Sequence, residues 1–313
     1  MIKKSFAAAL LILAVYHLLL PHLPHKFYQI LGQQRSNYLK SQRYVYEVPS
    51  DTNVIVGSSM AETLNDAALG DGYYKLTLAG GSVFTALEIV QRSGKIPRVV
   101  LIETNVMGRG PDGELLHDLF SPPFYQLRQY SPIFREEGRP ANFVGGFAES
   151  VVRKSCEWTE RFAYGKDTTN PNSRVEEMPP GLREKLLQIE QKSWDFKPAP
   201  ETVQKNTDEL GRYVDALTQH GTTCVLFEMP MDESLTKLST PTLWRQAINE
   251  RFPADQYHWL TFDRSRNYKT RDGVHLVRAE ADLLTQVVID FIKRLPTQQV
   301  VSDRNSQASQ QSQ

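Results

Sequence analysis

The fold is decided by the stretch Asn53-Val-Ile-Val-Gly-Ser-Ser-Met-Ala-Glu-Thr-Leu64. A short run of apolar, mostly β-branched residues ends in Gly57, two serines follow, and the residues after them favour a helix. The stretch therefore predicts a strand, a tight turn and a helix. At such a turn, free N–H groups and the positive helix dipole favour a nearby anion. Ser58 and Ser59 are thus candidates either for a helix N-cap or for a nucleophile.

Outward from this stretch, apolar runs alternate with helical patterns. Further strands are expected at residues 72–78, 98–104, 222–228 and 256–262, and helices at residues 83–92, 201–220, 241–252 and 279–295. Continuous apolar strands that alternate with helices indicate a parallel sheet covered on both faces. We expect an α/β fold with a doubly wound, five-stranded parallel sheet in the flavodoxin-like order 2-1-3-4-5. In the last helix six residues are expected to face inward: Leu283, Leu284, Val287, Val288, Phe291 and Ile292.

The N-terminus combines Lys3 and Lys4 with an almost continuous apolar run from Ser5 to Leu20. This pattern is typical of a secretory signal or of an N-terminal membrane anchor. No convincing small-residue cleavage site follows Pro21, which favours an uncleaved anchor. The lysines would remain in the cytoplasm, so we expect the rest of the chain outside it, in the periplasm or at the cell surface. A cleaved signal is the alternative.

The expected organisation has four parts. Residues 1–21 form the anchor or signal, residues 22–50 a juxtamembrane stalk, and residues 51–297 the α/β domain. Residues 298–313 are rich in Gln and Ser and are expected to be disordered. A long insertion, residues 107–200, follows the third strand and is expected to lie over the site. Its aromatic residues could form either an acceptor cleft or a small core of their own: Phe120, Phe124, Tyr125, Tyr130, Phe134, Phe143 and Phe147.

Composition excludes several classes of function. The chain of 313 residues has 36 basic and 36 acidic side chains, a net charge of +0, and no basic excess that would indicate nucleic acid as a partner. Its two cysteines, Cys156 and Cys224, lie far apart without metal-ligand spacing, and we expect no metal and no cofactor. Cys224 lies in an apolar run typical of a buried residue, and a disulfide with Cys156 is the less favoured alternative.

Three further features complete a candidate site around Ser59. Gly80 and Gly81 follow the second strand, where glycine allows the backbone to approach a ligand. Asn105 follows the third strand and could donate a hydrogen bond to an oxyanion. Asp272 and His275 precede the last helix, and their spacing can set the carboxylate against imidazole Nδ1 and leave Nε2 free for a serine hydroxyl. In a doubly wound sheet, ligands bind beyond the carboxyl ends of strands 1 and 3, where these residues would meet.

These blocks resemble those of the SGNH hydrolases, the GDSL-like esterase and acyltransferase superfamily. Gly57-Ser58-Ser59 resembles the first block, with Ser58 where the family has aspartate, and Asp272 and His275 match the closing Asp-x-x-His. Gly80 resembles the oxyanion glycine, with Gly81 as its rival, and Asn105 resembles the asparagine of the third block. The resemblance covers residues 53–295 except the insertion. Gly-Ser-Ser variants behind an anchor resemble the extracytoplasmic branch, which includes cell-surface polysaccharide O-acetyltransferases and the D-alanyl transfer proteins of teichoic acid.

The resemblance implies an acyl-enzyme mechanism with Ser59, His275 and Asp272 as the catalytic triad. Ser59, Gly80 and Asn105 would form the oxyanion hole. The expected partners are an acyl donor, either a small ester or an acyl-carrying membrane protein, and a polysaccharide acceptor. A carbohydrate or lipid esterase is the first alternative. The second is a non-catalytic scaffold on a decayed hydrolase fold.

Overall fold

The structure is a computed structural model that describes residues 33–138 and 181–295, together with a few helical positions near the N-terminus, namely Lys4, Ser5, Phe6, Ala8, Leu11, Ala14, Val15 and Leu18. The predictions for Cys156, for the middle of the insertion and for the C-terminal tail lie outside these residues. Among the residues described, no helix is both long enough and apolar enough to cross a membrane. Most of the predicted anchor, residues 5–20, also lies outside them.

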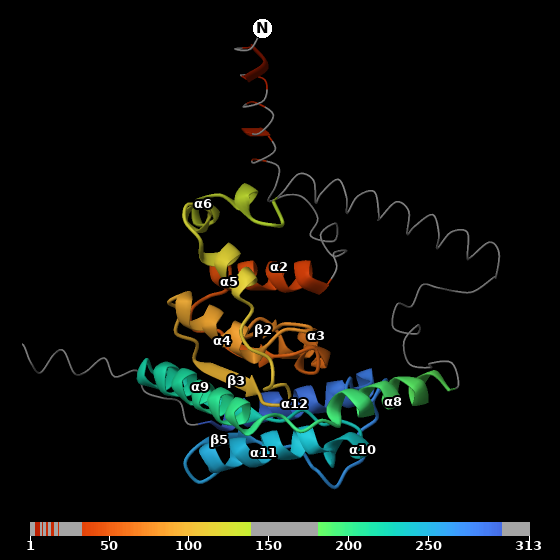
Figure 1. Ribbon diagram of the computed structural model, residues 1–313. Helices are drawn as coiled ribbons and strands as arrows, with labels where there is room; N and C mark the ends of the chain where they lie inside the picture. Colours follow the sequence, from red (N-terminus) through yellow and green to blue (C-terminus); the bar gives the residue numbers. More distant parts are fainter. Residues whose placement is uncertain are drawn as a thin grey trace, which may run out of the picture.

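The described chain forms a three-layer α/β domain (Figure 1). Its five parallel strands are β1 (Asn53–Gly57), β2 (Tyr73–Thr77), β3 (Val99–Glu103), β4 (Thr223–Phe227) and β5 (His258–Leu260). Their order is β2-β1-β3-β4-β5, which confirms the predicted fold class and topology. β5 is shorter than the predicted residues 256–262.

Helices cover both faces of the sheet because alternate strand residues point to opposite sides. Val54 and Val56 of β1 belong to one core, while Ile55 between them belongs to the other. The first core is closed by α2 (Gln33–Tyr46), α4 (Val83–Arg92), α5 (Gly113–Phe120), α9 (Pro200–Gln219) and α11 (Ser239–Arg251). The second is closed by η3 (Ala61–Thr63), α3 (Asp66–Leu69), α10 (Glu233–Thr236) and α12 (Arg278–Arg294).

Three predictions about the helices need correction. The helix predicted after Ser59 is divided into two short ones, the 3₁₀ helix η3 and then α3, so no continuous helix begins at the turn. In α12, Leu283 and Val287 are exposed, because the face that packs on the sheet is narrower than the apolar stripe. The predicted stalk contains α2, which belongs to the domain, since Tyr44 is fully buried and the helix packs against β2 and α4.

The insertion after β3 has structure at both of its ends. Its first part forms α5, α6 (Phe124–Tyr130) and the 3₁₀ turn η4 (Pro132–Phe134), and its last part forms α8 (Leu182–Trp194). Phe120 and Tyr125 pack with Tyr46 against the first core, whereas Phe124, Tyr130 and Phe134 are exposed, so the described aromatics do not form one small core of their own. Residues 139–180, which include Phe143 and Phe147, lie outside the described chain.

Candidate active site

A continuous hydrogen-bonded chain links Ser59, His275 and Asp272. Ser59 Oγ lies 2.9 Å from His275 Nε2, and His275 Nδ1 lies 2.6 Å from Asp272 Oδ2. Asp272 can accept a hydrogen bond from Nδ1 only if that nitrogen carries the proton, which leaves Nε2 to accept a hydrogen bond from the serine hydroxyl. The structure therefore brings the three predicted residues together in the order that general-base activation of a serine requires.

The backbone of the 270–276 loop fixes Asp272 against His275. Asp272 Oδ1 accepts hydrogen bonds from the N–H groups of Val274 and His275, at 3.1 and 2.8 Å. Partial burial opposes ionisation of this carboxyl, but the hydrogen bonds from the His275 ring and backbone lower the pKa of Asp272 to about 2. The carboxylate is therefore ionised at neutral pH and stabilises the imidazolium that forms when His275 takes a proton.

Glu103, at the end of β3, holds the turn that carries Ser59. The Glu103 side chain is fully buried and accepts hydrogen bonds from Ser58 N (2.8 Å), Ser58 Oγ (2.8 Å) and Ala61 N (3.2 Å). Burial raises the pKa of Glu103, and its hydrogen bonds with Ser58 and Ala61 oppose the rise. Sequence reasoning missed this residue. Two signals could have found it. Glu103 is a carboxylate at the end of an otherwise apolar strand, and Ser58 stands where the SGNH hydrolases have aspartate.

Ser58 and Ser59 have different roles in the turn. Ser58 is buried, and its hydroxyl donates to Glu103 and accepts from Met60 N at 3.2 Å. Ser58 Oγ therefore accepts a hydrogen bond within the turn, while the N-cap position of η3 is Met60, without a side-chain cap. Ser59 is half-buried and directs its hydroxyl at His275. The structure thus separates the two serines: Ser58 is bonded within the turn, and Ser59 stays the candidate nucleophile.

The turn after β2 separates Gly80 from its rival Gly81. The Gly81 N–H donates to the Leu78 carbonyl at 2.9 Å, so it is engaged within the turn. Gly80 has φ of +63°, a left-handed conformation that glycine adopts without strain. Within the part of the chain that the structure describes, neither the Gly80 N–H nor the Ser59 N–H has a hydrogen-bond partner. Of the two glycines, only Gly80 therefore has a free N–H to offer a ligand.

Helix α2 supports this turn from outside the sheet. The side chain of Asn37 is buried, and it donates to the Ala79 carbonyl at 2.9 Å while accepting from the Ala79 N–H at 3.0 Å. This pair of hydrogen bonds fixes the peptide group immediately before Gly80. Gln33, one turn earlier in α2, lies so close to Gly80 that a Cβ at this glycine would clash with its amide.

Asn105 is used differently from the prediction. Its carboxamide is buried, accepts from Met229 N at 2.7 Å and donates to Met229 O at 2.9 Å, so it joins the loops after β3 and β4. One of its two Nδ2 hydrogens is thereby engaged. A role as oxyanion donor would depend on the remaining hydrogen and stays a prediction.

The end of the insertion packs on the loop that carries the Asp-His pair. Arg183, in the first turn of α8, donates to Thr270 O at 3.0 Å and to Asp232 at 2.8 Å. Leu187 of the same helix lies against Gly273, where an added Cβ would meet its side chain at 2.7 Å. The insertion therefore contacts the 270–276 loop at this end, through α8.

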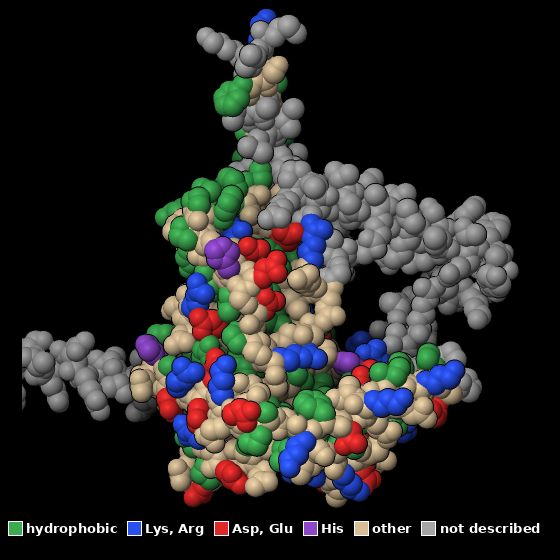
Figure 2. All heavy atoms as spheres, viewed as in Figure 1, with side chains coloured by type: hydrophobic (Ala, Val, Ile, Leu, Met, Phe, Trp, Pro, Cys, Tyr) green, Lys and Arg blue, Asp and Glu red, His purple; other side chains and the backbone are tan. Residues whose placement is uncertain are grey.

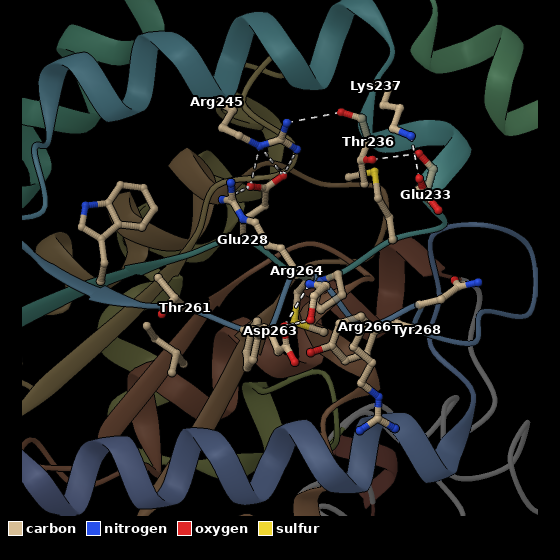
Figure 3. A pocket seen from close by; sticks show the side chains of 18 residues that line it. Glu228, Glu233, Thr236, Lys237, Arg245, Thr261, Asp263, Arg264, Arg266 and Tyr268 are labelled. Carbon is tan, nitrogen blue, oxygen red and sulfur yellow. Dashed lines mark hydrogen bonds and ion pairs between the residues drawn. The ribbon is translucent and has the colours of Figure 1, made fainter.

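A pocket of about 460 Å³ opens at the carboxyl ends of β4 and β5 (Figure 3). Glu228 points into it between Arg245, which binds it through two nitrogens, and Arg264, at 3.0 Å. None of Ser59, Asp272 and His275 lines this pocket. Met231 and Tyr268, which line the pocket, belong to the second core together with Val274.

Residues that could hold a metal do not gather in the described chain, where no group of three or more His, Cys, Asp or Glu side chains has a suitable arrangement. Cys224 is buried with a free thiol, and burial raises its pKa to about 12, so it is inert at neutral pH. The candidate site thus consists of Ser59, His275 and Asp272, with Glu103 and Asn37 holding the two turns.

Two comparisons with known proteins found no match. No model of a known protein family matches the chain, and no curated protein matches it at a significant level.

Proposed function

We propose that this protein is a serine-dependent acyltransferase that moves an acyl group to a cell-surface polysaccharide. The observation that carries the proposal is the chain from Ser59 Oγ through His275 to Asp272, with distances of 2.9 and 2.6 Å. Such a chain activates a serine for attack on an acyl carbon.

The reaction consists of two displacements. His275 Nε2 takes the proton of Ser59 as its oxygen attacks the carbonyl carbon of the donor, and the proton then passes to the departing group. An acceptor hydroxyl next gives its proton to His275 and attacks the acyl-Ser59 ester, and His275 passes that proton to Ser59 Oγ as the bond between Oγ and the acyl carbon breaks. In the described part of the chain the N–H groups of Ser59 and Gly80 have no hydrogen-bond partner, which supports a role as oxyanion donors, with Asn105 as a third candidate.

The proposals for the polysaccharide acceptor and for the compartment are based on the sequence alone. The apolar run from Ser5 to Leu20 behind two lysines supports a tether that leaves the domain outside the cytoplasm. An enzyme in that position would act on a polymer that is exported or assembled at the surface. A C-terminal reporter that is active only after export tests the topology, and activity of a cytoplasmic reporter instead would contradict it.

The function is tested with a fluorophosphonate probe and an acyl ester. The full-length chain should be labelled at Ser59, and the Ser59→Ala variant should not. Mass spectrometry should find the acyl group on the Ser59 peptide, and an added glycan should divert it from water to sugar. Acyl release that ignores every acceptor would favour the esterase alternative. A chain that is folded but never labelled would favour the non-catalytic alternative.

A further inference from the structure

Helix α6 has its polarity reversed relative to an ordinary surface helix. Its one charged residue, Arg128, is buried at 4% exposure and donates to the carbonyl of Asp118 at 2.6 Å. Phe124, Leu127 and Tyr130 lie at helical spacing and are exposed by 53%, 37% and 84%. A helix in contact with water places its charges outward and its apolar residues inward. The outward face of α6 exposes these three side chains together with the uncharged Gln126 and Gln129, and it carries no charge.

The apolar surface continues beyond the helix. Phe134 of η4 is 39% exposed, and the whole segment from Pro122 to Phe134 carries Arg128 as its single charged side chain. We call Phe124, Leu127, Tyr130 and Phe134 the α6 surface. Figure 2 shows hydrophobic side chains gathered at this end of the molecule. Contiguous exposed apolar side chains of this kind mark interaction sites.

Ion pairs hold the segment after η4 rigidly on α2. Glu136 pairs with Arg35 at 2.6 Å, Glu137 pairs with Arg43, and Arg135 pairs with Glu47 at 2.9 Å. Phe124 and Arg128 line the same depression as Gln33, the first residue of α2. The α6 surface therefore lies beside the point where the chain enters the domain.

The short length of chain before α2 indicates what the α6 surface contacts. Only the twelve residues 21–32 separate the apolar run, which ends at Leu20, from Gln33. Even fully extended, the connection spans at most about 45 Å. If the run is anchored in a bilayer, α2 and the α6 surface beside it must stay close to that bilayer. Figure 1 also shows α6 at the end of the domain nearest the N-terminal residues.

We propose that the α6 surface docks on the lipid bilayer, with Phe124, Leu127, Tyr130 and Phe134 entering the interfacial region. Aromatic and apolar side chains on a short segment without exposed charge fit this region. The docking rests on the N-terminal anchor described under the proposed function, and it adds a second contact that fixes how the domain is oriented on the membrane.

The test places an environment-sensitive NBD fluorophore on the full-length chain in phosphatidylcholine–phosphatidylglycerol vesicles. The probe is attached in Tyr130→Cys and, as the matched control, in Glu250→Cys. Glu250 is exposed on α11, at the opposite end of the domain from α6 (Figure 1). The unchanged chain, treated in parallel, reports labelling of the native cysteines. Brominated lipids quench a probe in the bilayer, and iodide quenches a probe in water.

The probe at position 130 should be quenched several-fold more by brominated lipid than the probe at position 250, and it should be protected from iodide. Adding Phe124→Ser and Phe134→Ser should reduce both effects. Iodide quenching at 130 as strong as at 250, on a chain that floats with the vesicles, would overturn the docking alone. Protection from both quenchers would mean that protein covers the surface, which also overturns it. If the chain does not float with the vesicles, the proposed membrane anchor is contradicted together with the docking. Labelling of Ser59 by a fluorophosphonate tests the proposed triad independently of both.

Discussion

Glu103 accepts hydrogen bonds from both the backbone N–H and the hydroxyl of Ser58, at 2.8 Å each. The contact joins the end of β3 to the turn after β1, next to Ser59. Gly57 makes this approach possible, since a Cβ there would lie 2.4 Å from the Glu103 carboxylate. The Ser59 turn is therefore shaped by a side chain from the neighbouring strand, and only the short η3 helix follows it.

Replacing Glu103 should destabilise this turn in proportion to the hydrogen bonds lost. Glu103→Ala leaves the N–H groups of Ser58 and Ala61 unpaired in a buried cavity and should lower the free energy of unfolding by about 3 kcal/mol. Glu103→Gln can still accept from these N–H groups while its amide donates to Ser58 Oγ, so it should cost less than half as much. Urea unfolding of both variants checks the order. Equal losses for Gln and Ala would mean that the charge, and not the hydrogen bonds, holds the turn.

Ser59→Ala and His275→Ala should each reduce turnover of an acyl ester by on the order of 10³-fold or more, because Ser59 supplies the attacking oxygen and His275 takes its proton. Neither change removes buried contacts of the sheet, so the melting temperature should change little. Steady-state kinetics and thermal unfolding of the same preparations provide the measurement.

Ser58→Ala is the matched control for the serine pair. It removes a hydroxyl that donates to Glu103 and accepts from Met60 N, so it should reduce stability while leaving Ser59 reactive with a fluorophosphonate. If Ser58→Ala loses all labelling while Ser59→Ala retains it, the nucleophile has been assigned to the wrong serine.

The ionisation of Asp272 should be visible in the pH dependence of stability. Its pKa in the folded chain is about 2, below the usual 3.8, so the ionised form stabilises the fold. This contribution, about 1–2 kcal/mol after allowance for its partial exposure, is complete above about pH 4 and is lost as the pH falls toward 2. The difference in stability between the wild type and Asp272→Asn should therefore shrink on acidification. A difference that stays constant between pH 6 and pH 3, by thermal unfolding, would contradict the assignment.

The sheet was predictable because its inner strands β1, β3 and β4 are almost entirely buried and read as apolar runs, whereas the edge strands β2 and β5 are partly exposed. Val99–Glu103 and Thr223–Phe227 differ from the predicted strands by a single residue at each end. The lengths of the outer elements were harder to predict. In α12, Leu283 and Val287 continue an apolar stripe that the sheet does not cover, and hydrophobicity alone does not show where coverage ends.

The triad was predictable because Ser59 and the Asp272–His275 pair lie at ends of elements whose order the sequence specifies. The residues that orient the site were not. Glu103 carries a charge at a strand end, and Asn37 lies in a helix that reads as a polar stalk, so each role depends on a contact between segments distant in sequence. Asn105 matched a motif position, but its bonds to Met229 could not be read from the sequence.

Asn37 should act as a positioning residue for the Gly80 N–H. Its two hydrogen bonds to Ala79 set the peptide that precedes Gly80, so their loss should misalign an oxyanion donor without removing a contact to the ground-state substrate. We expect Asn37→Ala to lower kcat about tenfold with KM little changed, because oxyanion stabilisation is expressed in the transition state. Asn37→Asp should be worse, since its carboxylate would face the Ala79 carbonyl.

Tyr74→Phe is the control, because it removes a 2.7 Å hydrogen bond to Lys40 O and loosens α2 on β2 without touching Ala79. If Tyr74→Phe lowers kcat as much as Asn37→Ala at an equal loss of stability, the effect belongs to α2 docking in general and Asn37 has no specific part in orienting Gly80.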